Sequence, residues 1–227
     1  MKLLAIALAP AFIIMIYIYF KDKYEKEPIR LLLKNFGLGA SVSIIITLIV
    51  GSVGNYFYPI TDPLSILQQF VKAFVIVALV EEFSKYVIVR YFAQRNKEFD
   101  EPFDGIIYAV MVSMGFAAIE NILYVFQFGM QNGILRAFTA VPAHATFGVL
   151  MGYFMGKAKF AKTKKDKIRL NLTGLLIATL FHGAYDFFLF INFIPGISIG
   201  AFVSLITALT LSRKAIKRHQ EVSHFKP

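Results

Sequence analysis

Long apolar blocks constrain the fold of this chain more than any other feature of its sequence. They cover residues 3–20, 36–58, 64–92, 105–128, 134–156, 170–190 and 193–211. Each block can cross a hydrocarbon core, which needs ~20 residues of helix. Because lipid offers loose backbone groups no hydrogen-bond partners, segments that span it must be helical. We therefore predict an all-α fold, a polytopic transmembrane helical bundle with about seven spans.

The connections between these blocks alternate between basic and neutral. Lys and Arg gather in residues 21–34, 90–97, 157–169 and 213–218, whereas residues 55–69, 129–133 and 191–195 contain neither. Basic connections of membrane proteins face the cytoplasm, so we predict an outside N-terminus and a cytoplasmic C-terminus. The net charge of +10 then reflects orientation and contact with membrane lipids, and no nucleic-acid partner is expected.

The chain has the organisation of a single integral-membrane domain, residues 1–227, with no repeat or soluble module. Residues 212–227 are predicted to form a solvated, partly helical cytoplasmic tail, in which His219 and His224 lie at the surface. The sequence contains no cysteine, which excludes disulfides, thiolate nucleophiles and cysteine-ligated metal sites.

Ionisable side chains interrupt the blocks where the chain should lie inside the bilayer. They are Glu81, Glu82, Glu120, His144, His182 and Asp186. A charge at the bilayer centre costs ~2.5–3.5 kcal/mol, so each of these residues is a functional hypothesis. With a helical rise of ~1.5 Å per residue, Glu81 and His182 both lie ~18 Å from the cytoplasmic ends of their helices. Glu120 and His144 fall in the same middle-to-outer half, so we expect four helices to bring acid–base groups to one depth.

Local spacing leaves two interpretations of these residues open. Glu81 and Lys85 share a helix face at i, i+4, which fits a neutralising ion pair as well as a reactive site. His182 and Asp186 have the same spacing, which can orient an imidazole, present two metal ligands or join two helices. His144 precedes glycines at 148, 152 and 156, a small-residue face that predicts close helix packing.

Carboxylates and imidazoles at one depth favour water activation. A carboxylate can accept the proton of water while histidines position the water or stabilise an oxyanion. No G-x-S-x-G serine elbow is present in any block. A zinc-dependent reaction stays open, although H-E-x-x-H is absent. A proton-coupled transporter or relay is a further alternative, without the inverted repeat typical of that class.

Four short motifs carry a family resemblance. They are EEFSK at 81–85, FAAIEN at 116–121, PAHATFG at 142–148 and HGAYD at 182–186. In this order they resemble the PrsW family of bacterial membrane proteases, within the wider group of CAAX proteases and bacteriocin-processing proteins. The resemblance implies a multi-pass protein of the bacterial cell membrane that makes the first (site-1) cut in an anti-sigma factor during a stress response. It implies a glutamate-dependent endopeptidase whose substrate is a single-span membrane protein, with no cofactor expected and zinc not excluded.

The resemblance also implies roles for individual residues, within catalytic helices at roughly 64–191. Glu81 corresponds to the general base of a glutamate pair. The expected catalytic residues are Glu81, Glu82, Glu120, His144 and His182, and the expected supporting residues are Lys85, Asn121 and Asp186. Asp186 stands where prenyl-protein enzymes have an asparagine that stabilises the oxyanion. An ionised aspartate cannot donate a hydrogen bond, so Asn121, His144 or a protonated carboxyl is left as the oxyanion donor.

Overall fold

The computed structural model describes residues 2–226, which form helices joined by short connections and contain no strand. Two continuous helical segments, called rods here, lie between α1 and α6, and each contains wider, π-helical turns. The first rod follows α1 and consists of α2, a π-helical stretch and α3; the second consists of α4, α5 and two π-helical stretches. The elements are α1 (Lys2–Lys21), α2 (Ile29–Leu38), η1 (Gly39–Ser43), α3 (Ile44–Phe57), α4 (Ile66–Val71), η2 (Lys72–Leu79), α5 (Val80–Ile88), η3 (Val89–Ala93), α6 (Pro102–Phe138), α7 (Ala140–Lys159), α8 (Lys164–Phe190) and α9 (Ile199–Glu221).

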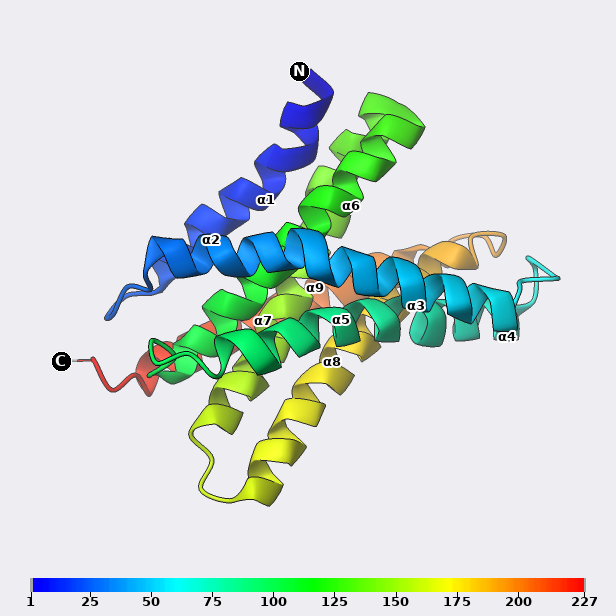
Figure 1. The fold of residues 1–227 in the computed structure, drawn as a ribbon. Helices are drawn as coiled ribbons and strands as arrows, with labels where there is room; N and C mark the ends of the chain where they lie inside the picture. The colour runs from blue at the N-terminus through cyan, green and yellow to red at the C-terminus, as the bar shows by residue number, and fades with distance from the viewer. Residues whose placement is uncertain (1, 227) are drawn as a thin grey trace.

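The connections fall at two ends of the molecule, as the charge pattern predicts. In Figure 1 the α1–α2 and α5–α6 connections and the C-terminus lie at the left, and the α7–α8 connection lies at the bottom. The N-terminus lies at the top, and the α3–α4 and α8–α9 connections lie at the right. All the basic connections therefore lie on the left and lower side of this view. The predicted orientation in the membrane stays a prediction.

Five stretches within residues 2–226 are long and apolar enough to cross a membrane. One of them, residues 102–159, contains both α6 and α7, and the α4–α5 rod is not among the five. The structure therefore confirms an all-helical membrane fold. The number of spans, predicted as about seven, stays a prediction.

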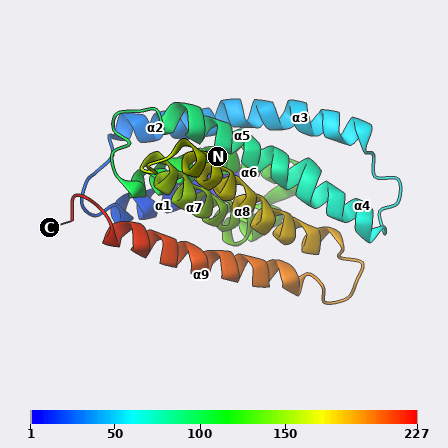
Figure 2. The ribbon, with the colours of Figure 1, turned by 90° about the horizontal axis from the view of Figure 1, so that it is seen from below.

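The α6–α7 pair forms the centre of the bundle. In the most apolar stretch of this pair, 78% of the residues are buried. In the other four candidate spans the corresponding share is 17–39%. Figure 2 shows α6, α7 and α8 lying between α3 on one side and α9 on the other. Large apolar side chains such as Ile13, Leu48 and Ile206 are more than half exposed on the outer helices. An apolar exterior around a tightly packed interior is the arrangement that lipid as a solvent favours.

Glycines allow the central helices to touch backbone to backbone. A Cβ at Gly152 on α7 would lie 2.2 Å from the carbonyl oxygen of Gly105 on α6, and a Cβ at Gly148 would lie 2.6 Å from the hydroxyl oxygen of Ser113. The close packing predicted for this face of α7 is confirmed. On the opposite side of α6, a Cβ at Gly115 would lie 2.0 Å from the carbonyl oxygen of Phe36 on α2. Glycine contacts therefore bring α2 and α7 close to α6.

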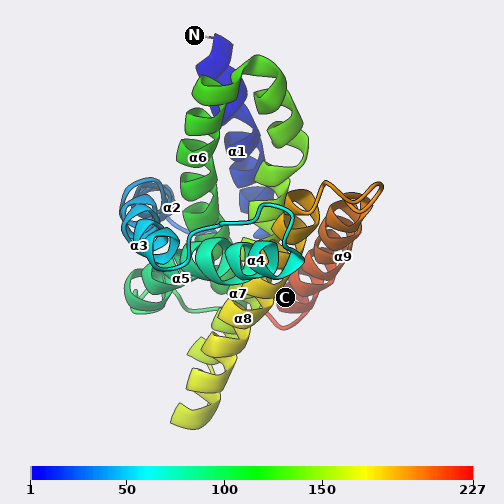
Figure 3. The same ribbon diagram turned by 90° about the vertical axis from the view of Figure 1, so that its right-hand side faces the viewer.

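The predicted boundary between the fourth and fifth spans was wrong. Gly129 leaves the helical conformation with φ 83° and ψ −175°, but the chain then resumes helix as far as Phe138, and α7 begins only at Ala140. This second part of α6 folds over as an arch, seen at the top of Figure 3. Residues 130–138 thus form a helical segment between Gly129 and α7 that carries Arg136 over Glu120.

The C-terminal prediction needs correction at His219. Helix α9 begins at Ile199 and extends to Glu221, so the tail is partly helical as predicted. His219 is 1% exposed, and its ring stacks on Tyr153 with 4.4 Å between centroids. Since α9 packs beside α7 along this length, its last turns are covered. His224 is exposed, as predicted.

Candidate active site

The glutamate pair lies on α5, between two π-helical stretches. Such wide turns change the direction in which side chains project and are frequent at functional sites. Ser84 donates its hydroxyl to the carbonyl oxygen of Glu81 at 2.7 Å and lies 2.5 Å from the hydroxyl of Ser43 in the π-helical stretch of the first rod. Thr47 donates to the same Ser84 oxygen at 3.1 Å. These hydroxyls hold α5 against the first rod and fix the position of the pair.

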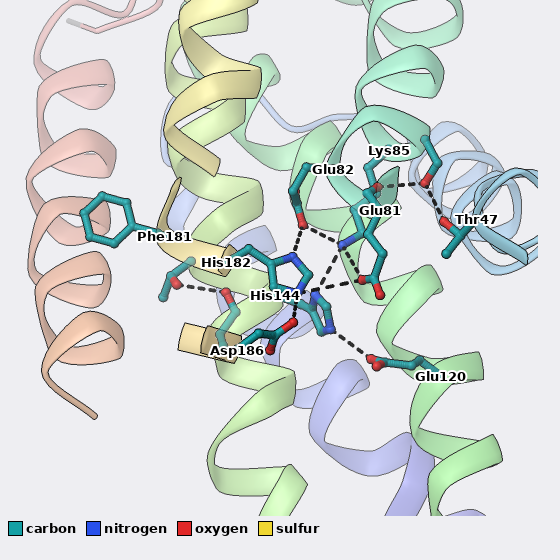
Figure 4. Close-up of polar contacts among 12 residues, drawn as sticks. Thr47, Glu81, Glu82, Lys85, Glu120, His144, Phe181, His182 and Asp186 are labelled. Atoms are coloured by element: carbon teal, nitrogen blue, oxygen red, sulfur yellow. Dashed lines mark hydrogen bonds and ion pairs between the residues drawn. The ribbon is translucent and has the colours of Figure 1, made fainter. Parts of the chain in front are cut away.

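Side chains from four helices meet around one cavity of about 500 Å³. Glu81 comes from α5, Glu120 from α6, His144 from α7, and His182 and Asp186 from α8 (Figure 4). The two imidazole rings are perpendicular, with 5.1 Å between centroids. The convergence expected from their common depth is therefore present in the structure.

Glu82 and Lys85 lie behind the cavity wall and are 0% and 1% exposed. Lys85 Nζ donates to Glu82 Oε1 at 2.7 Å, and it lies 3.2 Å from His144 Nδ1. Its separation from Glu81 Oε2 is longer, at 3.6 Å. The ion pair expected from the i, i+4 spacing is thus secondary to the pair with Glu82. Lys85 supplies the buried positive charge around which the polar side chains are arranged.

His182 is fixed by carboxylates at both ring nitrogens. Its Nδ1 lies 2.9 Å from Glu82 Oε1, and its Nε2 lies 3.3 Å from Asp186 Oδ2 and 3.9 Å from Glu81 Oε2. The ring of Phe147 stacks on the imidazole with 5.0 Å between centroids. When both nitrogens carry protons, this histidine can donate to both sides. Asp186 therefore does orient the imidazole, one of the interpretations that its spacing left open.

His144 is held from the opposite side by Glu120. Its Nε2 lies 2.9 Å from Glu120 Oε2, and Arg136 Nη2 lies 2.8 Å from the same oxygen. The guanidinium also covers the ring of Tyr124, with 3.9 Å between its Cζ and the ring centroid. Glu120 is thus a shared acceptor that fixes both a histidine and an arginine at the cavity wall.

Asn121 lies outside the cavity wall and is fully buried. Its amide donates to the carbonyl oxygen of Ala7 on α1 at 3.0 Å, and its Oδ1 accepts from Arg136 Nε at 3.0 Å. The structure therefore places it as a support for Arg136 and as a link to α1. Its amide is therefore engaged outside the cavity and does not line it.

Arg136 is the site residue that sequence reasoning missed. It lies on the arch of residues 130–138, which brings it back over Glu120. The sequence contained a signal for it, because Arg136 closely follows the neutral connection at residues 129–133. The charge alternation predicts no basic residue on that side of the molecule. Lys72, which also lines the cavity, is a second cation inside a predicted apolar block.

Glu81 lines the cavity with an oxygen that is buried and accepts no hydrogen bond. Within residues 2–226, Glu81 Oε2 is buried and has no hydrogen-bond partner. Buried acceptors are normally satisfied, and an exception needs a functional explanation. An acceptor facing a cavity that can hold water is suited to receive a proton from that water.

The same residues fit a metal ion by donor chemistry. Glu81, His144 and His182 each offer one ligand atom, and these atoms lie within 4.8 Å of one another. One carboxylate and two imidazoles form a familiar ligand set for catalytic zinc. A cation bound there would compete with the Lys85 ammonium for Nδ1 of His144.

Comparison with known proteins gives one consistent family. The model of a family described as "PrsW family intramembrane metalloprotease" matches residues 27–212. Protease PrsW of Oceanobacillus iheyensis is 40% identical over 190 residues, covering 83% of each chain. The proteins of the same name from Geobacillus kaustophilus and Bacillus subtilis are 38% and 33% identical, covering 83% and 82% of this chain and 80% and 82% of their own. No solved structure matches this chain.

Proposed function

This chain belongs to the PrsW family of intramembrane proteases and is a membrane peptidase, and we propose that it hydrolyses its substrate by glutamate-dependent water activation. The observation that supports this most directly is the buried oxygen of Glu81, which accepts no hydrogen bond and lies at a cavity that also presents His144 and His182. Membership of a protease family leaves the transporter alternative without support.

In the proposed reaction, Glu81 accepts a proton from water as the water oxygen bonds to the scissile carbonyl carbon. Negative charge moves to the carbonyl oxygen, and the tetrahedral intermediate then collapses with cleavage of the C–N bond. The proton held by Glu81 passes to the leaving amine, so the carboxylate is restored. Glu82 and Lys85 do not touch substrate in this scheme; they set the position and charge of His182 and His144.

The developing oxyanion needs a hydrogen-bond donor at the cavity wall. His144, His182 and Arg136 line the cavity and carry N–H groups, whereas the Asn121 amide is engaged by Ala7. A donor aimed at the charge of the intermediate is worth about 2.7–4 kcal/mol in transition-state stabilisation. We propose that this donor belongs to one of these three cavity-lining side chains.

We propose a single-span membrane protein as substrate, with the first cleavage of an anti-sigma factor as the physiological reaction. The support is the four-motif resemblance together with a reactive cavity inside a lipid-facing bundle. The test is co-expression with candidate anti-sigma factors, followed by detection of the shortened product. Wild type and the exposed control Glu221→Gln should both cut the same candidate, and Glu81→Gln and His182→Ala should not. Equal product with Glu81→Gln would contradict the proposal.

A metal-dependent version of the same peptidase is the second candidate. It is favoured by the description of the family as intramembrane metalloproteases and by the ligand set of Glu81, His144 and His182. A bound zinc ion would supply Lewis-acid polarisation of the substrate carbonyl or of water. Metal content and chelator treatment of the purified protein separate the two versions. Stoichiometric zinc whose removal abolishes cleavage, and whose return restores it, would favour the metal-dependent enzyme; cleavage by metal-free protein would favour Glu81 alone.

A further inference from the structure

A second group of carboxylates lies at the end of the molecule where the basic connections gather. Glu25 and Glu27 belong to the α1–α2 connection, and Asp104 belongs to the first turn of α6. Each offers one oxygen, and the three oxygens lie within 4.8 Å of one another. Asp104 precedes Glu120 by sixteen residues on α6, or ~24 Å of helix, so this cluster is separate from the catalytic cavity.

The cluster contains buried oxygens that accept no hydrogen bond from an N–H or hydroxyl group within residues 2–226. Glu27 and Asp104 are 1% and 0% exposed. Glu27 Oε2 accepts from the hydroxyl of Tyr108, and Asp104 Oδ2 accepts from the backbone N–H groups of Asp100 and Glu101 at 2.8 and 2.7 Å. Their other oxygens, Glu27 Oε1 and Asp104 Oδ1, are buried without a hydrogen-bond partner.

Asp22, at the end of α1, repeats the pattern nearby. Asp22 is 1% exposed, and neither of its side-chain oxygens has a hydrogen-bond partner in the described part of the chain. Removing a carboxylate from water without a hydrogen bond or counter-charge is costly. The carboxylates at this end are therefore buried without enough hydrogen-bond partners, and they do not form a solvated acidic surface.

No basic side chain balances this charge. Within residues 2–226, no Lys, Arg or His nitrogen lies within 4.0 Å of a carboxylate oxygen of Glu25, Glu27 or Asp104. Lys26 donates instead to the backbone carbonyls of Tyr19 and Asp22.

We propose that Glu25, Glu27 and Asp104 form a binding site for a hard divalent cation, Mg²⁺ or Ca²⁺. The donors are all oxygens, with no imidazole or thiolate, which is the ligand set that these ions prefer. Unused oxygens of Glu27 and Asp104 are available for coordination, and the ion would supply the missing positive charge. It would join the α1–α2 connection to the start of α6.

The end of α9 packs onto the same region, which gives the site a structural role. Ser223 donates to Glu101, and the Gln220 amide donates to the carbonyl oxygen of Lys21 at the end of α1. Figures 1 and 2 show the C-terminus beside the α1–α2 connection at the left. A cation here would hold together the ends of three helices on the face away from the arch.

The test is the melting temperature of purified protein during titration with MgCl₂ or CaCl₂, at ionic strength kept constant with choline chloride. A ligand that binds only the folded state raises the melting temperature in proportion to ln(1 + [L]/Kd). Wild type should show a saturable rise of ~5 °C or more at a hundredfold excess over Kd. Glu27→Gln, which retains an oxygen acceptor for Tyr108, should lose the rise. Glu221→Gln should keep it, and so should Glu81→Gln, which alters only the catalytic cavity.

Glu25→Gln provides a second variant in case Glu27→Gln does not fold, because Glu25 is only partly buried. It should fold as wild type does and need at least tenfold more cation for the same rise. Isothermal titration of wild type should give one ion per chain. The proposal is overturned if neither cation raises the melting temperature of wild type, if the rise persists unchanged in Glu27→Gln or Glu25→Gln, or if it is lost in Glu81→Gln.

Discussion

At the scale of single residues, adjacent glutamates have different tasks. Each has a buried oxygen without a hydrogen bond, but Glu82 Oε1 contacts Lys85 and His182 behind the cavity wall, whereas Glu81 lines the cavity itself. Removing one partner of a buried ion pair costs ~3–5 kcal/mol, because the other charge is left uncompensated. Glu82 should therefore contribute to stability as well as to activity, and Glu81 mainly to activity.

Glu82→Gln should lower both the melting temperature and the cleavage rate, since it strands the Lys85 ammonium. The expected loss of unfolding free energy is ~3 kcal/mol, measured by thermal unfolding of the purified protein. The double variant Glu82→Gln/Lys85→Met removes both charges and should recover part of the stability without recovering activity. A Glu82→Gln protein as stable as wild type would show that the pair is not structurally important.

Arg136→Gln should reduce kcat, because it removes the charge that holds Glu120 and an N–H donor from the cavity wall. We expect a fall of about 100- to 1,000-fold, the range for loss of one preorganised donor. Arg169→Gln is the matched control, because Arg169 is an exposed arginine paired to Asp166. Equal kcat values for wild type and Arg136→Gln would remove Arg136 from the site.

At the scale of elements, glycine contacts set the distances between α6 and its neighbours. The sequence predicted the Gly148, Gly152 and Gly156 face because small residues at four-residue spacing identify a close helix contact. It could not identify the partner, since Gly105 lies 47 residues before Gly152 and nothing local joins the two.

Gly152→Ala should destabilise the protein by ~1–3 kcal/mol, because its Cβ would lie 2.2 Å from the carbonyl oxygen of Gly105 and force the helices apart. Gly51→Ala is the control, because a Cβ at that helical position meets nothing within 4 Å. Thermal unfolding of both variants checks the comparison. A melting temperature for Gly152→Ala equal to that of Gly51→Ala would contradict the proposed packing.

The arch at residues 130–138 marks the limit of sequence reasoning about elements. The neutral, glycine-containing residues 129–133 predicted a connection between two spans, but the chain resumes helix after Gly129. Arg136 on this segment pairs with Glu120, a contact between segments that periodicity does not report. Similarly, α9 continued through a charged sequence because α7 packs against it and buries His219.

At the scale of the whole molecule, the sequence determined the helical class and the meeting of Glu81, Glu120, His144 and His182. Depths estimated from the charge alternation were sufficient to predict this meeting. With a rise of ~1.5 Å per residue, the thickness of the bilayer limits how far a helix can shift along its axis. The sequence could not show which site residues line the cavity and which lie behind its wall. Whether a carboxylate faces the cavity or lies behind it depends on the rotation of α5, which the π-helical turns on either side of it set.

The absence of native cysteines allows a direct test of orientation. Asp62→Cys, in the neutral α3–α4 connection, should react in intact cells with a thiol reagent that cannot cross the membrane. Lys162→Cys, in the basic α7–α8 connection, should react only after permeabilisation. Both positions are exposed, so access depends on the side of the membrane alone. The reverse pattern would overturn the predicted outside N-terminus.

The most direct test of the central claim is the single-turnover rate of cleavage by purified, reconstituted protein carrying Glu81→Gln. The account predicts that this variant melts close to wild type and cleaves at least about a hundredfold more slowly, as expected for loss of a general base. The exposed control Glu221→Gln should cleave at the wild-type rate. Cleavage by folded Glu81→Gln within tenfold of wild type would contradict the assignment of Glu81 as the group that activates water.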